Sequence, residues 1–166
     1  MTALRIGRLD VSLVPATSSG PTRLAMSGRI DDSVNLGDLV EKIPPGDLVI
    51  DTGGVSFINS VGMREWLRLL RGLRGRQITL ERVADVLMTQ LNMIADSSKG
   101  VRITSFHAQY ACPKCGAETA PLVDAELYAQ QLAQMQAPPL PCPECGSAME
   151  LGDFAERYLT IFRALS

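Results

Sequence analysis

Four cysteines stand in two matched pairs in the last third of the chain. The pairs are CPKCG at residues 112–116 and CPECG at residues 142–146, so both have the form C-P-x-C-G. Each pair can hold a metal ion from one side, and the glycine after the second cysteine permits a tight turn that aims backbone N–H groups at sulfur. Four thiolates suit tetrahedral zinc, and a complete sulfur shell leaves no open position for catalysis. The spacing therefore predicts one structural Zn²⁺, bound by Cys112, Cys115, Cys142 and Cys145.

Other uses of these cysteines are less favoured. A thioredoxin-like redox site needs one CxxC pair at the start of a helix, not two matched pairs. Two structural disulfides would be unusual in a reducing compartment. His107 is the only histidine and lies close to Cys112. Because four thiols are already available, we expect His107 to be a strand residue rather than a ligand.

Ser60 is the second residue whose position could support chemistry. In VSFINSVG, residues 55–62, an apolar run stops at Ile58 and a helical pattern begins near Gly62. One interpretation is that Ser60 caps the helix, since serine is among the best capping residues. The other is that its hydroxyl is modified. A phosphoserine would bring about −1.5 to −2 charges to a helix N-terminus, where free N–H groups favour an anion, and Arg64 lies one turn on.

The hydrophobic patterns indicate the elements that position these residues. Alternation or short apolar runs predict strands, and apolar residues at helical spacing predict helices. The expected strands are residues 9–15, 23–30, 47–54, 76–83 and 100–111, and the expected helices are residues 31–43, 62–75, 84–96 and 153–165. Asp32 or Ser33 would cap the first helix. In the second helix Trp66 should face the core, and Arg64, Arg68 and Arg71 should form a solvated face.

Two strands followed by alternating helices and strands are typical of an α/β fold. We expect a mixed sheet packed with helices, with a small zinc-binding insertion before the C-terminal helix. The expected division is residues 1–109 for the sheet body, residues 110–151 for the insertion, and residues 152–166 for a C-terminal helix that docks on the body. The apolar face of that last helix includes Phe154, Tyr158 and Leu165.

Charge and hydropathy exclude several classes of protein. Sixteen basic and eighteen acidic residues nearly cancel, which is unlike a nucleic-acid-binding protein. The insertion is acidic, because Lys114 is its only base and it carries Glu118, Asp124, Glu126, Glu144 and Glu150. No apolar run is long enough to span a bilayer, and residues 1–15 have no signal-peptide pattern. We therefore expect a cytoplasmic protein that binds neither nucleic acid nor membrane.

Three segments together resemble the STAS domain, the fold of bacterial anti-sigma-factor antagonists. They are LAMSGRID, LVIDTGGVSFINSVGMREWLRLL and RQITLERVADVLMTQLNMI, and the resemblance covers roughly residues 5–108. The family motif places Asp51 on its first acidic position, Asn59 on its second, Ser60 on the phosphorylated serine and Gly62 on the glycine. Here Asn59 replaces an aspartate, and Val61 replaces a hydroxyl residue. The zinc insertion lies outside the family pattern.

The resemblance implies a signalling module rather than an enzyme. In the family an anti-sigma factor acts as a serine kinase, and phosphorylation releases the antagonist from this partner. The chain offers no Ser/His/Asp set, no P-loop and no GxGxxG motif, so we expect no catalytic residues. Two alternatives stay open. One is a STAS-like scaffold or adaptor without a working phosphosite, and the other, less favoured, is a nucleic-acid-binding zinc ribbon.

Overall fold

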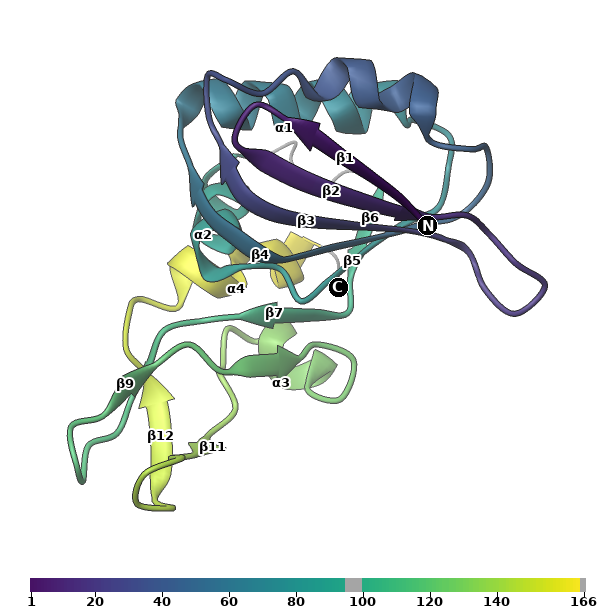
Figure 1. The fold of residues 1–166 in the computed structure, drawn as a ribbon. Coiled ribbons are helices and arrows are strands. Elements are labelled where there is room, and N and C mark those ends of the chain that lie inside the picture. The colour runs from purple at the N-terminus through teal and green to yellow at the C-terminus, as the bar shows by residue number, and fades with distance from the viewer. Residues whose placement is uncertain (95–99, 165–166) are drawn as a thin grey trace.

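A six-stranded mixed sheet forms the body of the protein. The computed structural model describes residues 1–94 and 100–164 (Figure 1). Strands follow the order β1-β2-β3-β4-β5-β6, in which β1 to β3 are antiparallel and β3 to β6 are parallel neighbours. Their bounds are Thr2–Ile6 (β1), Leu9–Val14 (β2), Thr22–Ile30 (β3), Leu48–Ile58 (β4), Ile78–Glu81 (β5) and Val101–Ile103 (β6). The expected α/β class with a mixed sheet is confirmed.

The hairpin of β2 and β3 follows directly from the alternation of apolar residues. Val11 pairs with Met26 and Leu13 pairs with Leu24, and all four side chains are buried. Successive side chains on a strand point to opposite faces, so this register places the apolar set of both strands on one side of the sheet.

Four helical segments complete the body. They are the 3₁₀ helix η1 (Leu36–Lys42), α1 (Ser60–Gly72), α2 (Asp85–Met93) and α4 (Glu156–Ala164). Helix α1 packs beside η1, and the two lie together at the top of Figure 1. Trp66 of α1 is fully buried, as expected. Among the described residues, no helix is long and apolar enough to cross a membrane.

The segment expected to form a helix over residues 31–43 is shorter and of a different kind. The 3₁₀ helix begins only at Leu36, with Asn35 before it, so neither Asp32 nor Ser33 caps it. Ser33 is used elsewhere, because its N–H and its hydroxyl both donate to the Asp31 carboxylate. These local bonds hold residues 31–33 in a turn instead of a helical start.

Helix α4 docks on α2. The Ile161 N–H donates to Asn92 Oδ1 at 2.8 Å, and the Phe162 ring lies 5.2 Å from that of Phe106. Tyr158 is also buried, but Phe154 precedes the helix and is 76% exposed. Phe154 therefore does not belong to the docking face, and Leu165 lies outside the described residues.

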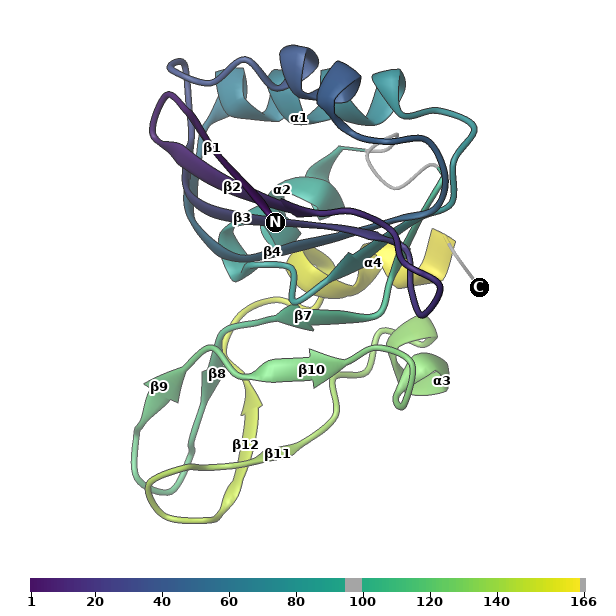
Figure 2. The ribbon, with the colours of Figure 1, turned by 45° about the vertical axis from the view of Figure 1, so that its right-hand side comes forward.

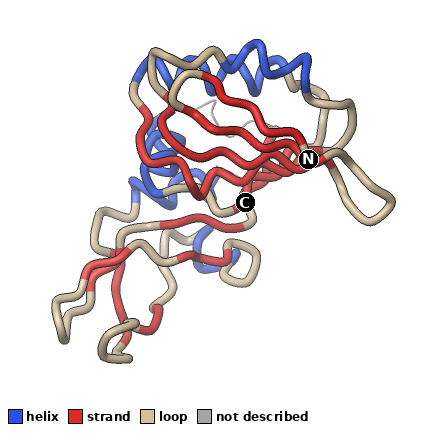
Figure 3. The backbone as a smooth tube through the Cα atoms, in the orientation of Figure 1, coloured by secondary structure: helices blue, strands red, loops and turns tan. Residues whose placement is uncertain are grey.

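A small lobe hangs below the sheet body (Figures 1 and 2). Figure 3 shows that it consists mostly of loops and short strands. One pair joins β7 and β10, and a four-stranded sheet has the order β11-β12-β8-β9. The bounds are Ser105–His107 (β7), Tyr110–Ala111 (β8), Glu118–Thr119 (β9), Leu122–Asp124 (β10), Ala129–Ala133 (α3), Leu140–Pro141 (β11) and Ala148–Leu151 (β12).

The pairing of β7 with β10 means that the lobe involves residues before 110. The single strand expected over residues 100–111 is divided into β6, β7 and β8, and no two of these pair with the same neighbour. Strand β7 also contacts the body, because the Val83 N–H donates to the Ser105 carbonyl and the His107 N–H donates to the Val83 carbonyl. This segment connects the two parts of the protein.

Candidate metal centre and strand-to-helix site

The fold brings the four cysteines together at the far end of the lobe. One sulfur from each residue lies within 4.8 Å of the other three. The Sγ atoms of Cys112 and Cys145 are 3.5 Å apart, and those of Cys115 and Cys142 are 3.6 Å apart. A tetrahedron with metal–sulfur bonds of about 2.3 Å has edges of ~3.8 Å. The sulfur arrangement is therefore compatible with a metal site.

The two cysteine turns have the same backbone geometry. In the first, the Gly116 N–H donates to the Cys112 carbonyl at 2.9 Å, and the Cys112 N–H donates to the Ala117 carbonyl at 2.8 Å. In the second, the Gly146 N–H and the Cys142 N–H repeat both bonds at the same lengths. Gly116 and Gly146 both have a φ of +77°, a conformation that favours glycine. The shared C-P-x-C-G pattern thus produces two equivalent turns, which we call knuckles 1 (112–116) and 2 (142–146).

The ionisation of the four cysteines also favours a bound cation. The pKa of Cys112 is lowered to about 6, chiefly because the Cys115 N–H donates to the Cys112 Sγ at 3.5 Å. The Ala117 N–H favours a thiolate at Cys115, but desolvation and the other three thiols outweigh it and raise the pKa of Cys115 to about 12. Sulfurs this close cannot all ionise unless a cation neutralises them. The donor set fits a metal ion bound by all four.

Hydrogen bonds behind the sulfur cluster hold the lobe together. The Tyr110 hydroxyl donates to the Pro138 carbonyl at 2.8 Å, and burial raises the pKa of Tyr110 to about 12. His107 lies in β7, where its Nδ1 is 2.8 Å from the Ala120 carbonyl. The described four-cysteine group does not include His107, in agreement with its assignment as a strand residue.

Ser60 is the first residue of α1, directly after the long strand β4, and its side chain is exposed. The helix is capped by Asn59, whose Oδ1 accepts a hydrogen bond from the Gly62 N–H at 2.8 Å. The interpretation of Ser60 as the cap is therefore wrong. The helix begins two residues earlier than expected, and this leaves the Ser60 hydroxyl free of the capping role.

Gly62 is fixed by a close approach of two backbone segments. A Cβ at this position would lie 1.8 Å from the carbonyl oxygen of Ile30, at the end of β3. The same carbonyl accepts the Asn59 N–H at 3.4 Å. Because Ile30 pairs with Ile58, the end of β3 lies directly beside the start of α1. Only glycine allows this approach.

Asp51 does not join Ser60. It lies in the first half of β4, where it pairs with Glu81 and Ala25 across the sheet. Its carboxylate accepts from the Gly53 N–H and from Arg82 Nε, each at 2.9 Å. At ~3.3 Å per residue, the path from Asp51 to the end of the strand is roughly 20 Å. The sequence motif therefore combines residues from two separate places on the sheet.

Asp31 is the acidic residue at the same sheet edge as Ser60. It follows Ile30 and is 1% exposed. The Ser33 hydroxyl and N–H, followed by Arg8 Nη1 at 3.0 Å and Arg29 Nε at 3.3 Å, hold the pKa of Asp31 well below its usual range. The motif around Ser60 does not include Asp31. Its only signal in the sequence is an acidic side chain directly after a strand that runs parallel to β4.

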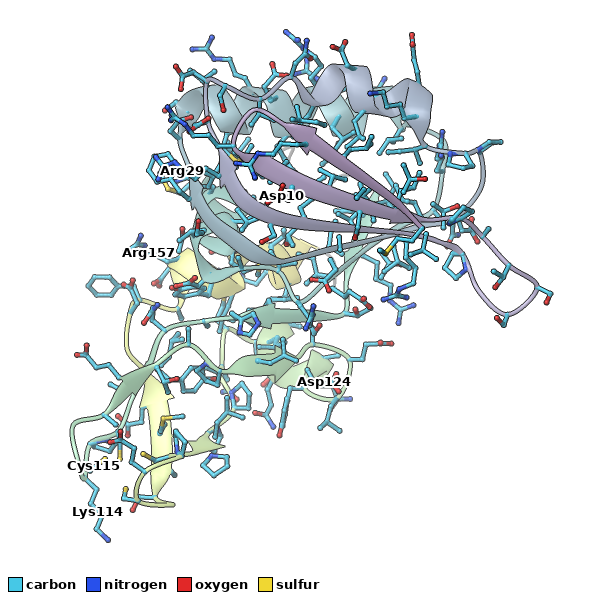
Figure 4. The ribbon with its side chains drawn as sticks, in the orientation of Figure 1. Asp10, Arg29, Lys114, Cys115, Asp124 and Arg157 are labelled. Carbon is cyan, nitrogen blue, oxygen red and sulfur yellow. The ribbon has the colours of Figure 1, made fainter. Side chains whose placement is uncertain are left out.

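Arg29 connects this buried acid to the strand that leads into α1. Its guanidinium lies 3.9 Å from the centre of the Phe57 ring, three residues before Ser60. Figure 4 labels Arg29 at the end of β3, on the side of the body where β4 rises to α1. The contacts of Arg29 with Asp31 and Phe57 therefore connect the ends of β3 and β4 just before Ser60.

Comparisons of the chain with family models, curated proteins and solved structures found no match.

Proposed function

We propose that the chain is a non-enzymatic regulatory module of the STAS type, which binds a partner protein and is controlled by phosphorylation at Ser60. The observation that carries this proposal is the exposed Ser60 side chain at the start of α1. The close-packed Gly62 supports it, because it is a position of the family motif. The order of strands, with a helix directly after β4, is also compatible with this family.

Phosphorylation would change the surface through charge. The phosphate adds about −1.5 to −2 charges at a helix N-terminus, where backbone N–H groups and the helix dipole tolerate an anion. Arg64 is exposed one turn further along α1. A partner surface that accepts a neutral hydroxyl at this place would lose affinity for the charged form. The class of partner that the resemblance favours is an anti-sigma factor that acts as a serine kinase.

A single zinc ion would serve as the brace of the small lobe. Four sulfur ligands are the usual set for structural zinc, and they leave no position for a substrate. The ligands would be Cys112, Cys115, Cys142 and Cys145. This role supplies structure rather than chemistry, which agrees with a module that acts by binding.

The direct test is modification by a kinase. Wild-type protein is incubated with ATP and an anti-sigma-type serine kinase, and the phosphate is mapped by mass spectrometry. We expect one phosphate, on Ser60, and none in Ser60→Ala. Ser18→Ala changes another exposed serine and should be phosphorylated like wild type. A chain that stays unmodified, or carries its phosphate elsewhere, contradicts the switch.

A scaffold without a phosphosite is the second candidate, and Asn59 favours it. Its amide caps α1 without the charge of the motif's aspartate, so the fold no longer needs that acid. A partner pull-down with Ser60→Glu separates the two candidates. Loss of the partner supports the switch, and equal retention supports the scaffold.

A further inference from the structure

We infer that the four-cysteine cluster is a site of oxidation by hydrogen peroxide, at which two disulfides form between the knuckles. The expected pairs are Cys112–Cys145 and Cys115–Cys142. The inference extends the proposed zinc site, because the same sulfurs would release the metal when they are oxidised. It does not depend on Ser60 or on the identity of a partner.

Geometry selects these pairs. The contact of 3.5 Å joins Cys112 to Cys145, and the contact of 3.6 Å joins Cys115 to Cys142, so both run from one knuckle to the other. Within knuckle 1, the Cys115 N–H donates to Cys112 Sγ, a bond of the reduced turn that a link between residues 112 and 115 would distort. The two crossing pairs start from contacts of 3.5 and 3.6 Å, in a cluster whose sulfurs all lie within 4.8 Å of one another.

The two cysteines of each crossing pair differ in solvent exposure. Cys115 and Cys145 are exposed, whereas Cys112 and Cys142 are buried, so each crossing pair has one exposed and one buried sulfur. Peroxide reaches the exposed sulfur first and oxidises it to a sulfenic acid. The buried partner sulfur then displaces hydroxide and forms the disulfide. The exposed cysteines therefore react with peroxide, and the buried ones resolve the product.

The reaction balances with two molecules of peroxide. In each pair, two thiolates lose two electrons to one peroxide, whose O–O bond breaks to give two hydroxides. One S–S bond forms, and the two sulfurs no longer bind the metal. For the whole site, four thiolates and two peroxides yield two disulfides, four hydroxides and one free Zn²⁺.

Crossing disulfides would keep the lobe closed after the metal leaves. They join residue 112 to 145 and residue 115 to 142, so they hold the two knuckles together as the metal does. Disulfides within each CxxC turn would leave the knuckles unconnected. The disulfides would thus replace the metal in joining the two knuckles. Because disulfides can be reduced again, the lobe would respond to oxidants reversibly.

The sequence makes the pairing easy to read. Trypsin cuts after Lys114, between the cysteines of knuckle 1, and a glutamate-specific protease cuts after Glu144, between those of knuckle 2. Together they place the four cysteines on peptides 103–114, 115–118, 127–144 and 145–150. Every possible disulfide therefore gives a different pair of linked peptides.

The experiment uses the full chain after its zinc content has been measured. It is treated with hydrogen peroxide, released zinc is followed with a chromogenic chelator, and the non-reduced digest is analysed by mass spectrometry. We expect peptide 103–114 linked to 145–150 and peptide 115–118 linked to 127–144, with zinc release in step and reversal by dithiothreitol. Links within a knuckle, or retention of zinc until the thiols are overoxidised, overturn the inference. A chain without zinc that still forms crossing links supports the pairing but refutes the proposed zinc.

Paired variants provide an independent measure. Cys112→Ser with Cys145→Ser leaves one crossing pair, whereas Cys112→Ser with Cys115→Ser leaves only the cysteines of knuckle 2. Where both variants keep the circular dichroism of wild type, we expect disulfide formation to be about tenfold faster in the first variant than in the second. Equal rates in two variants that keep the circular dichroism of wild type contradict the inference. If the spectra show an unfolded lobe, the wild-type peptide map decides.

Discussion

Asn59 shows how one side chain can keep the structure of a motif while it changes the charge. Its Oδ1 caps α1 through the Gly62 N–H, a bond that aspartate would make equally well. Asn59→Ala should lower the free energy of unfolding by about 1 kcal/mol, because this N–H loses its partner. Asn59→Asp should leave it unchanged or raise it slightly, since a negative charge suits a helix N-terminus. Urea unfolding of both variants measures the difference, and an Ala variant as stable as wild type would show that the cap is unimportant.

Gly62 tests the close approach of β3 and α1. A methyl group at this position would lie 1.8 Å from the Ile30 carbonyl oxygen, so the backbone must move apart. Gly62→Ala should therefore reduce the free energy of unfolding by ~2 kcal/mol or more. Gly20→Ala is the matched control, because a Cβ at Gly20 meets no atom within 4 Å. Similar unfolding curves for the two variants would contradict the proposed packing.

Asp31 gives the body a defined response to acid. Because its pKa is held below the ordinary value of about 3.9, its carboxylate stabilises the fold above that pH, and this stabilisation is lost as pH falls through the lowered pKa. Ser33→Ala removes the hydroxyl that contributes most to the shift. The midpoint of acid unfolding should move to higher pH in this variant. Ser18→Ala, in the exposed turn before β3, should unfold at the wild-type pH.

At the scale of elements, apolar periodicity predicted the core elements but not the connections. Leu24 and Met26 in β3, or Trp66 and Leu69 in α1, recur at spacings that only one element type can bury. Strand β1 was missed because it is an edge strand of Thr2–Ile6 with little buried surface. The start of η1 depends on the local bonds from Ser33 to Asp31, and the division of residues 100–111 depends on hydrogen bonds to distant residues. Periodicity encodes neither.

Tyr110 links β8 to the loop before β11, and its hydroxyl can be tested alone. Tyr110→Phe leaves the Pro138 carbonyl without its donor, which should destabilise the lobe by about 1–2 kcal/mol. Burial raises the pKa of Tyr110 to about 12, so the protonated side chain stabilises the fold below pH 10, and this stabilisation is lost between pH 10 and 12. Thermal unfolding across this range should show a smaller alkaline loss in Tyr110→Phe. Tyr128→Phe, which keeps the hydrogen bond of Tyr110, should show a larger alkaline loss than Tyr110→Phe.

For the whole molecule, the sequence specified the four-cysteine cluster better than the surface site. Two C-P-x-C-G turns contain all four cysteines, so spacing alone placed Cys112 and Cys145 together. The edge around Ser60 combines residues from β3, β4 and the turn after β3, and no local pattern shows that Asp31 and Arg29 meet there. Asp51 was assigned to the motif by resemblance alone, and it lies in the first half of β4, away from this edge.

Metal removal should loosen the lobe without unfolding the body. The lobe strands around the cysteines have two to four residues each, whereas β3 and β4 have nine and eleven. So little structure cannot offset the loss of the proposed zinc, whose binding is worth on the order of 10 kcal/mol. Both ends of the lobe are held independently of the metal, by β7 beside Val83 and by α4 on α2. Opening should therefore stop at these two anchors.

Hydrogen exchange measured by mass spectrometry tests this separation. A strong zinc chelator should increase deuterium uptake in residues 110–151 and leave β2 to β5 protected. Cys142→Ser should show the same pattern without chelator. Lys114→Ala changes the residue next to Cys115 but none of the four cysteines, so its deuterium uptake should match that of wild type. A metal site confined to the lobe cannot control the exchange of a sheet that has its own core. An increase of deuterium uptake in the sheet body together with the lobe would therefore contradict the prediction and show that the two form one cooperative unit.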